Sequence, residues 1–297
     1  MNAMTRKPPA DVKEALENCT SVLETRKVES PKLSAELLVA HVTHQTRSEV
    51  LASPERLVSP VEAAQLELCL TRRMKHEPIP YIIEEVEFYS TPFHISKGVF
   101  IPRPETECLV DAALEITKGI TDHEPRVYDM CTGSGNIVIS MALNMPEGEF
   151  IASDVSNIAI QVAGQNVRRH DLQNYVTLRE GTLFTPMRTE LSLDFDILVT
   201  NPPYIKTQDI NKLPNQIRDH EPVIALDGGR DGMICIKSIL DGAAPLLRPG
   251  GYVLIEADPT IIPVIRTEVR RRTQFGDVVI HKDLNDQDRV CQFRLKA

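Results

Sequence analysis

The chain has 297 residues, with 33 Lys and Arg against 42 Asp and Glu, and a formal net charge of −9. Its 42% hydrophobic and 25% charged composition is that of a globular protein and excludes disordered, collagen-like and repeat proteins. The length permits one large domain or two smaller ones. The acidic balance weighs against a protein that coats nucleic acid through phosphate contacts.

No stretch approaches the roughly 20 apolar residues of a membrane span. Residues 1–12 are polar and contain two prolines, unlike a secretory signal. The six cysteines are widely scattered without a Cys-x-x-Cys pair, which argues against both a disulfide framework and a zinc site. We therefore predict a cytoplasmic protein that binds neither membrane nor metal.

The first part of the chain is predicted to be helical. Apolar residues recur at helical spacing over 12–23 and again over 33–42. A third helix has clear start signals, with Ser59 as N-cap, Pro60 at the first helical position and Glu62 three residues after the cap. No reactive constellation is found here, so we expect a small bundle that serves packing and partner recognition.

The pattern changes at Pro78-Ile79-Pro80. Two short β-prone runs, 86–89 and 93–95, are separated by Ser90-Thr91-Pro92 and predict a hairpin. The following segment 101–107 is too rich in proline for a regular element, and a helix is expected from Glu107.

From residue 125 onward, strand and helix patterns alternate, which predicts an α/β fold with a doubly wound, mostly parallel sheet. Ligands of such sheets bind at the carboxyl ends of the strands. Strands are predicted over 127–130, 149–154, 176–180, 195–200, 251–257, 278–281 and 289–295. Helices are predicted over 137–143, 158–170, 233–246 and 262–272.

The first motif, Asp129-Met130-Cys131-Thr132-Gly133-Ser134-Gly135, lies between a predicted strand and a helix. Glycine there permits a sharp turn and close approach to a ligand, but the third glycine of the dinucleotide fingerprint is missing. Asp154 ends the next strand and can accept both hydroxyls of a ribose, while Asp129 can face a cationic group. A glycine-rich loop without a ligand stays open as the alternative.

The second motif, Asn201-Pro202-Pro203-Tyr204, follows a strongly apolar strand. Two prolines can simply end a strand. The chemical interpretation is that the Asn201 side-chain oxygen and the Pro202 carbonyl accept hydrogen bonds from a planar nitrogen and direct its lone pair at a methyl donor. The prolines stiffen the loop, and Tyr204 can stack on the planar group.

With these two motifs the chain resembles the peptide-chain release factor glutamine N5-methyltransferases, which are class I S-adenosylmethionine-dependent enzymes. Further similar segments are Phe88-Tyr89 with Phe93, residues 101–107, His220-Glu221-Pro222, Gly228-Gly229-x-Asp231-Gly232, and Asp283-Leu284 with Asp288-Arg289-Val290. The resemblance implies a Rossmann-like fold, S-adenosyl-L-methionine as cofactor, and the glutamine of a release factor Gly-Gly-Gln motif as substrate.

The resemblance also implies site residues. The catalytic set is Asn201, Pro202, Pro203 and Tyr204. The cofactor set is Asp129, Cys131, Thr132, Gly133, Ser134, Gly135, Asp154, Val155, Thr182, Leu183 and Asn201. The substrate is expected to contact Asn201, Pro202 and Tyr204. Apart from the resemblance, Glu105, Glu221 and Glu107 are acidic candidates for contacts to the substrate, should it be a cationic small molecule.

The chain departs from the family pattern at several positions. Cys131 replaces a usual glycine and is interpreted as a small buried hydrophobic residue. Thr182 replaces a usual carboxylate near the adenine, Glu85 and Ser90 replace hairpin glycines, and Glu256 lacks the usual glycine and glutamine after it. These departures indicate a divergent member of the family.

The motif positions favour two domains joined by a connector: a helical recognition domain over 1–80, a β-hairpin linker over 81–104, and a methyltransferase domain over 105–297. Three alternatives stay open: methylation of a small amide, amine or guanidinium, methylation of an adenine or guanine in nucleic acid, and a non-catalytic binding module. The net charge weighs against the nucleic-acid substrate, and the intact tetrapeptide weighs against the binding module.

Overall fold

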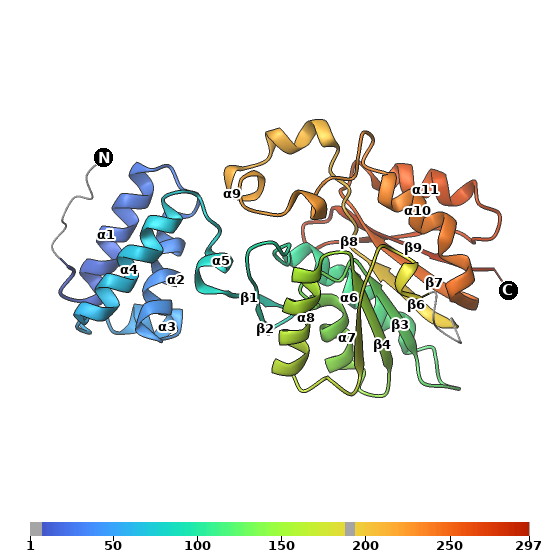
Figure 1. Cartoon of the computed structure of the whole chain (residues 1–297), viewed down its shortest axis with the longest axis horizontal. Helices are drawn as coiled ribbons and strands as arrows, with labels where there is room; N and C mark the ends of the chain where they lie inside the picture. Colours follow the sequence, from blue (N-terminus) through green and yellow to red (C-terminus); the bar gives the residue numbers. More distant parts are fainter. Residues whose placement is uncertain (1–7, 188–193, 297) are drawn as a thin grey trace. The chain divides into compact units, whose positions relative to one another are not determined.

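The structure is a computed structural model, which describes residues 8–187 and 194–296. The chain divides into two compact units (Figure 1). The first, which we call the helical unit, comprises residues 1–84 and 215–220, and the sheet unit comprises residues 85–214 and 221–297. The expected domains run over 1–80, 81–104 and 105–297, so parts of the first and third, residues 1–7, 188–193 and 297, lie outside the described residues.

Amphipathic helices around a core of their own build the helical unit. The predicted start of one helix is confirmed, because the Ser59 hydroxyl accepts from the Glu62 backbone N–H while the Glu62 carboxylate accepts from the Ser59 N–H. Leu23, Leu38 and Leu66 are among the buried core residues. The helices are α1 (Val12–Thr25), α2 (Pro31–Thr43), α3 (Arg47–Ala52), α4 (Pro60–Arg73), α5 (Ile79–Ile83) and α9 (Asn215–Arg218).

Residues 215–220 belong to this unit although they lie far along the chain. The Arg73 guanidinium, 4% exposed, donates to Gln216 Oε1 at 3.4 Å, and Gln216 Nε2 donates to Glu29 Oε2 at 2.8 Å. His220 Nε2 lies 3.0 Å from the Lys75 carbonyl oxygen. Sequence patterns did not predict that residues 215–220 belong to the helical unit, because the segment contains only a single helical turn.

The sheet unit confirms the predicted doubly wound sheet. Its seven strands have the order β5-β4-β3-β6-β7-β9-β8, with parallel pairing from β5 through β7 and antiparallel pairing of β9 with both neighbours. The chain order reverses between β3 and β6, which is where such sheets bind ligands. The strands are β3 (Arg126–Met130), β4 (Glu149–Asp154), β5 (Val176–Glu180), β6 (Phe195–Thr200), β7 (Leu247–Glu256), β8 (Val279–Lys282) and β9 (Asp288–Arg294).

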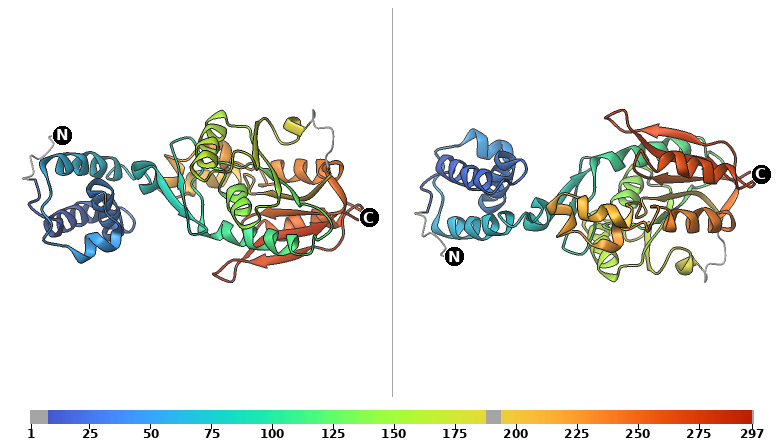
Figure 2. Two further views of the ribbon diagram at one scale, coloured as in Figure 1. Left: turned by 90° about the horizontal axis from the view of Figure 1, so that it is seen from below. Right: turned by 90° about the horizontal axis from the view of Figure 1, so that it is seen from above.

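Helices cover both faces of this sheet (Figure 2). Every residue of β6 is buried, and successive side chains alternate between the faces. Ile197 and Val199 pack with α6 and α7, whereas Leu198 packs with α10 and α11. The helices are α6 (Glu107–Thr117), α7 (Asn136–Asn144), α8 (Asn157–Arg169), α10 (Ile234–Gly242) and α11 (Ile262–Arg270).

The predicted hairpin is present as β1 (Glu85–Phe88) and β2 (Thr91–His94). Two predicted boundaries were wrong by four residues. The helix expected over 233–246 ends at Gly242 and is followed by a separate 3-10 turn, Ala244–Leu246, because Pro245 cannot continue the α-helical hydrogen bonding. β7 starts at Leu247, four residues earlier than expected.

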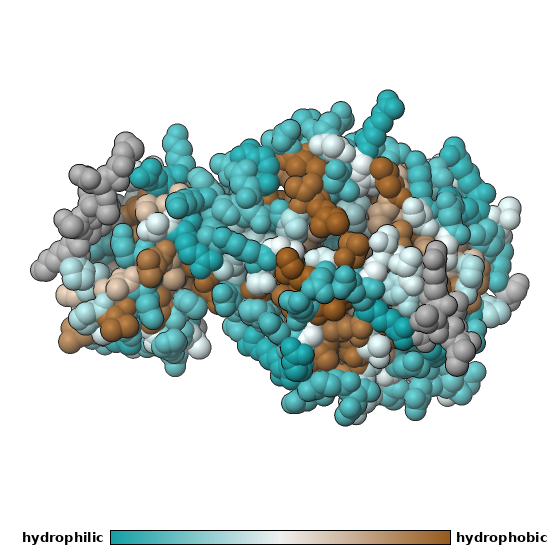
Figure 3. All heavy atoms as spheres, viewed as in Figure 1, coloured by the Kyte–Doolittle hydropathy of each residue, from teal (hydrophilic) through white to brown (hydrophobic). Residues whose placement is uncertain are grey.

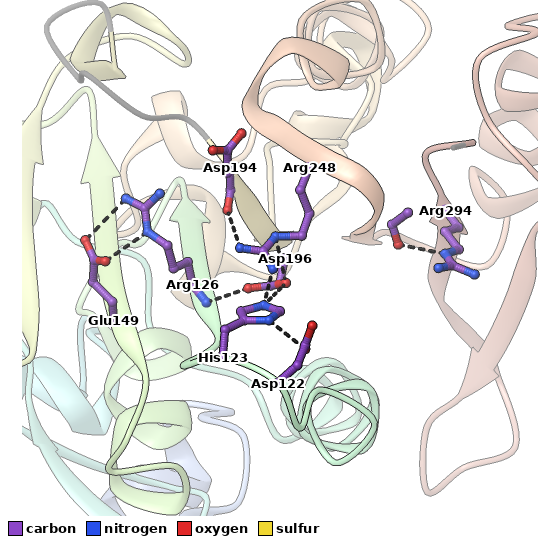
Figure 4. Close-up of polar contacts among 9 residues, drawn as sticks. Asp122, His123, Arg126, Glu149, Asp194, Asp196, Arg248 and Arg294 are labelled. Carbon is purple, nitrogen blue, oxygen red and sulfur yellow. Dashed lines mark hydrogen bonds and ion pairs between the residues drawn. The ribbon is translucent and has the colours of Figure 1, made fainter.

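A polar cluster lies at the amino ends of β3 and β6, away from the carboxyl ends where a ligand is expected (Figure 4). Asp196, 3% exposed, accepts from the Arg126 backbone N–H at 2.8 Å and forms an ion pair with Arg248 at 3.1 Å. His123 Nε2 lies 2.9 Å from the same carboxylate, which raises the His123 pKa. These contacts satisfy a buried carboxylate, so we assign them a structural role.

Candidate active site

A cavity of about 480 Å³ opens at the carboxyl ends of β3, β4 and β6. Three segments that follow or end these strands line it: residues 130–133, 153–156 and Asn201 with 203–205. The two motifs of the sequence therefore meet in one cavity. This is the position that the strand order predicts, beside the reversal between β3 and β6.

The loop after β3 turns sharply because three of its residues adopt left-handed backbone conformations. Cys131, Gly133 and Gly135 have φ values of 63°, 57° and 81°. No atom lies within 4 Å of where a Cβ of Gly133 would stand, so backbone is exposed to the cavity there. The Thr132 hydroxyl donates to Asp129 Oδ2 at 2.6 Å and ties the loop to the strand beneath it.

Asp154 faces the cavity and holds the same loop. Its carboxylate accepts from the Gly133 backbone N–H and the Ser156 backbone N–H, both at 2.9 Å. Burial raises the pKa of this carboxyl, and the backbone hydrogen bonds oppose that shift. Each oxygen keeps a lone pair that can accept from a ligand hydroxyl. Val155, 46% exposed, and Leu183 add apolar surface beside it.

Asp129 is fully buried under the loop and does not line the cavity. Burial raises its pKa to about 7, although the Thr132 hydrogen bond lowers it in part. Its Oδ1 atom has no hydrogen-bond partner among the described residues. A buried carboxylate with an unused oxygen is suited to a nearby cationic group, which would stabilise its ionised form.

The tetrapeptide Asn201–Tyr204 follows β6 and is packed from behind by residues 228–232. A Cβ on Gly228 would lie 2.7 Å from Tyr204 Cα and 2.8 Å from the Pro203 carbonyl oxygen. Gly228 N–H donates to the Ile205 carbonyl at 2.8 Å. The glycine-rich stretch thus supports the tetrapeptide through contacts that only glycine permits.

Comparisons with known proteins establish the family of this chain. A model described as the PrmC N-terminal domain matches residues 14–83, and one described as the methyltransferase small domain matches residues 106–218. The release factor glutamine methyltransferase of Geobacter sulfurreducens is 33% identical over 98% of this chain and 100% of its own length. The chain belongs to the release factor glutamine methyltransferase family.

The release factor glutamine methyltransferase of Moorella thermoacetica is 38% identical over 82% of this chain and 84% of its own length. That of Rhodopirellula baltica is 32% identical over 96% of this chain and 97% of its own length. A crystal structure of the hMettl16 catalytic domain in complex with an MAT2A 3'UTR hairpin matches with a TM-score of 0.53 at 14% identity. The match covers 100% of this chain and 95% of that one, and it shows that the two proteins have a similar fold.

Some residues predicted for the site of this methyltransferase do not line the cavity. Ser134, Gly135, Pro202, Glu105 and Glu221 are not among its walls. Ser134 is buried, and its carbonyl accepts from Asn166. The Gly135 backbone lies against Ala163 of α8. A Cβ added to Gly135 would lie 3.3 Å from the Ala163 Cβ.

Two of the acidic substrate candidates, Glu221 and Glu107, bind other groups of the protein. Glu221, 5% exposed, pairs with Arg103 and accepts from the Ile101 backbone N–H at 3.3 Å. Burial raises the Glu221 pKa, which Arg103 partly offsets. Glu107 accepts from the Tyr89 backbone N–H at 2.9 Å and joins the hairpin to α6.

The cavity also has walls that sequence reasoning missed. Phe100 and Thr106 come from the proline-rich segment or its flank, and Ile224, Ile234 and Cys235 come from the region after the tetrapeptide. The resemblance of residues 101–107 to the family segment was the available signal for Thr106.

No group of three or more His, Cys, Asp or Glu side chains that could hold a metal ion is found within the described residues. Over the same part of the chain, none of the helices has the length and apolar character needed to span a membrane.

Proposed function

We propose that this protein is a cytoplasmic enzyme that transfers a methyl group from S-adenosylmethionine to the side-chain amide nitrogen of the glutamine in a release factor Gly-Gly-Gln motif. The observation that carries the proposal is that Asn201, Pro203 and Tyr204 line the same cavity as Gly133 of the glycine loop and Asp154. Family membership supports the choice of a release factor as partner.

The residues around the cavity fit the cofactor. Asp154 would hold the ribose hydroxyls, Gly133 would leave room for the methionine part, and Val155 and Leu183 would pack against the adenine, with Thr182 beside them. The unused Asp129 oxygen beneath the loop would favour the positive charge of the cofactor. When bound, S-adenosylmethionine supplies an electrophilic methyl group on a sulfonium.

Asn201 and Pro202 would orient the acceptor nitrogen. The lone pair of an amide nitrogen is delocalised, so the nitrogen is a poor nucleophile. Hydrogen bonds from its two N–H groups to Asn201 Oδ1 and the Pro202 carbonyl would pull it toward tetrahedral geometry and direct its lone pair outward. No base is needed before transfer, because the nitrogen sheds a proton once it carries the methyl group.

The rim of the cavity supports a protein substrate over a small polar one. Ile224, Ile234 and Val155 line the cavity and are 59%, 63% and 46% exposed. Figure 3 shows several separate hydrophobic areas on the face of the sheet unit that is turned to the viewer. Such exposed apolar residues mark interaction sites in soluble proteins. The helical unit would contribute to recognition of the release factor.

The test is to incubate the protein with labelled S-adenosylmethionine and, separately, a release factor, free amino acids, or RNA. We expect label on the release factor that disappears when the Gly-Gly-Gln glutamine is replaced. Label found only in small molecules or only in RNA would contradict the proposal.

Asn201→Ala tests the site directly. We expect at least ~10²-fold slower transfer, the scale for removing a preorganised polar contact at a reacting centre, with cofactor binding retained. Asn285→Ala, in the exposed β8–β9 turn, is the matched control and should keep wild-type activity. Full activity of Asn201→Ala would refute the assigned role.

A further inference from the structure

Asn166, in α8, is a buried side chain whose two polar atoms both bind backbone groups. It is 0% exposed. Its Oδ1 atom accepts from the His94 backbone N–H at 2.7 Å, and its Nδ2 atom donates to the His94 carbonyl at 2.9 Å. Nδ2 also donates to the Ser134 carbonyl at 2.9 Å. One amide therefore joins two backbone segments that are remote from each other in the sequence.

Both of these segments form walls of the cavity. Ser134 belongs to the glycine loop, of which residues 131–133 line the cavity. His94 ends β2, and the chain that follows it reaches the cavity at residues 98–100. Asn166 and the two residues that it binds are not among the cavity walls. Asn166 is therefore placed to act on the cavity through the two segments, without touching a ligand itself.

Other residues of α8 contact the same two segments. Ala163 lies one turn before Asn166, and its Cβ is 3.3 Å from where a Cβ of Gly135 would stand. Ile158 Cδ1 is 3.3 Å from where a Cβ of Gly98 would stand. Such apolar contacts limit how closely the helix and each segment approach, but they have no preferred direction. The hydrogen bonds of Asn166 are directional and also fix the position of each segment along the helix.

The three hydrogen bonds require a side-chain amide. An amide offers two N–H hydrogens and one carbonyl oxygen, and the two carbonyls and one N–H of His94 and Ser134 use all three. Aspartate has the same shape but carries at most one hydrogen for the two carbonyls, and leucine carries none. Either replacement at Asn166 leaves a buried carbonyl without its donor, which is costly.

A displaced glycine loop would also disturb Asp154. Ser134 directly follows Gly133, whose N–H donates to the Asp154 carboxylate at 2.9 Å. Asp154 is the residue proposed to hold the ribose of the cofactor. The catalytic side chain Asn201 follows β6, and none of the hydrogen bonds of Asn166 reaches it. The loss of Asn166 should therefore affect the cofactor more than the transfer step.

We propose that Asn166 is a positioning residue for cofactor binding, which holds the glycine loop and residues 94–100 at the separation that the cofactor requires. This inference rests on the proposed function, because it takes S-adenosylmethionine as the ligand. The attachment of both segments to one amide is a property of the protein alone.

Asn166→Asp and Asn166→Leu test the role in release factor methylation. We expect the KM for S-adenosylmethionine to rise about 10-fold or more, the scale for losing a buried hydrogen bond, while kcat at saturating cofactor stays within about 3-fold. Asn166→Asp keeps the shape and the bond from the His94 N–H. It decides alone if Asn166→Leu does not fold.

The division between KM and kcat distinguishes positioning from a purely structural role. A variant that only loses stability has fewer folded molecules, which lowers kcat but leaves KM unchanged. Val127→Ala is the matched control, because Val127 is 0% exposed in β3 and does not line the cavity. It should keep the wild-type KM for the cofactor. A wild-type KM in Asn166→Asp, or a fall in kcat alone, would overturn the inference.

Amide hydrogen exchange, followed by nuclear magnetic resonance, tests the attachment without cofactor. We expect the N–H groups of Gly133 and Gly135 to exchange faster in Asn166→Asp than in the wild type, when both are compared with the N–H groups of β7. Val127→Ala should leave this ratio unchanged. The same ratio in Asn166→Asp as in the wild type would show that Asn166 does not hold the loop.

The two readouts separate the two proposals. A wild type that leaves release factor unmodified contradicts the proposed function, and the exchange rates still decide whether Asn166 holds the glycine loop. An active wild type with an unchanged KM in Asn166→Asp contradicts the positioning role and leaves the proposed function intact.

Discussion

Cys131 occupies a backbone conformation that usually favours glycine. Its φ of 63° lies in the left-handed region, where a side chain costs about 1–3 kcal/mol. The family resemblance places glycine at this position, and the conformation explains that preference. The side chain packs against the core next to the cavity, consistent with a small apolar role.

This strain predicts opposite responses at two cysteines. Cys131→Val should lower the free energy of unfolding by about 2–3 kcal/mol, because β-branched residues fit poorly at positive φ, whereas Cys131→Gly should change it by less than about 1 kcal/mol. At Cys69, inside α4, glycine should be the more harmful of the two. Urea unfolding gives the free energy of unfolding of all four variants. If Cys131→Val were as stable as Cys131→Gly, the backbone at this position would not be strained.

At the scale of elements, the tetrapeptide depends on a second loop for its position. Residues 228–232 contact the backbone of Pro203 and Tyr204, and Ile205 N–H donates to the Leu226 carbonyl at 2.9 Å. Two backbones this close leave no space for a side chain. The glycine-rich stretch is therefore part of the architecture of the site although no residue from 228 to 232 lines the cavity.

Gly228→Ala should consequently impair the reaction. The new Cβ would lie 2.7 Å from Tyr204 Cα, so the tetrapeptide must shift, and we expect methyl transfer to slow by at least about 10-fold. Gly119→Ala is the control, since its Cβ would lie 3.4 Å from its nearest neighbour. Initial rates with release factor as substrate provide the measurement. Equal rates for both variants would show that the loop tolerates the displacement.

At the scale of the whole molecule, buried carboxyls set the pH dependence of stability. Burial raises the pKa of Asp129 and of Glu256 to about 7, and it also raises the pKa values of Asp154 and Glu221. In the unfolded chain these groups titrate near pH 4. Between these limits the folded state binds more protons than the unfolded state, so folding stability falls as pH rises.

We therefore expect the free energy of unfolding, without ligands, to be higher at pH 5.5 than at pH 8. The contribution of the raised pKa values to folding stability is fully present below the unfolded pKa values near 4, and it is lost as the pH rises through about 7. Urea unfolding at several pH values measures it. The double variant Asp129→Asn, Glu256→Gln should show a flatter profile, and a wild type that gains stability toward pH 8 would contradict these shifts.

Much of the fold was predictable because it depends on local patterns. The strand 195–200 and the helix opening at Ser59 and Pro60 were identified from residues within a few positions of each other. The short helices α3 and α5 were missed, because six and five residues are too few to establish a helical period. The segment 215–220 was missed because its partners, Glu29 and Arg73, are remote in sequence.

The sequence by itself determined the doubly wound sheet and the two motifs at its strand ends, since spacing and residue type encode local conformation and burial. Only the tertiary structure decided which side chains meet there. It pairs Glu221 with Arg103, and it brings Thr106 within hydrogen-bond distance of Asn201. The physical reason is that contacts between distant residues depend on strand order and register, which no local pattern records.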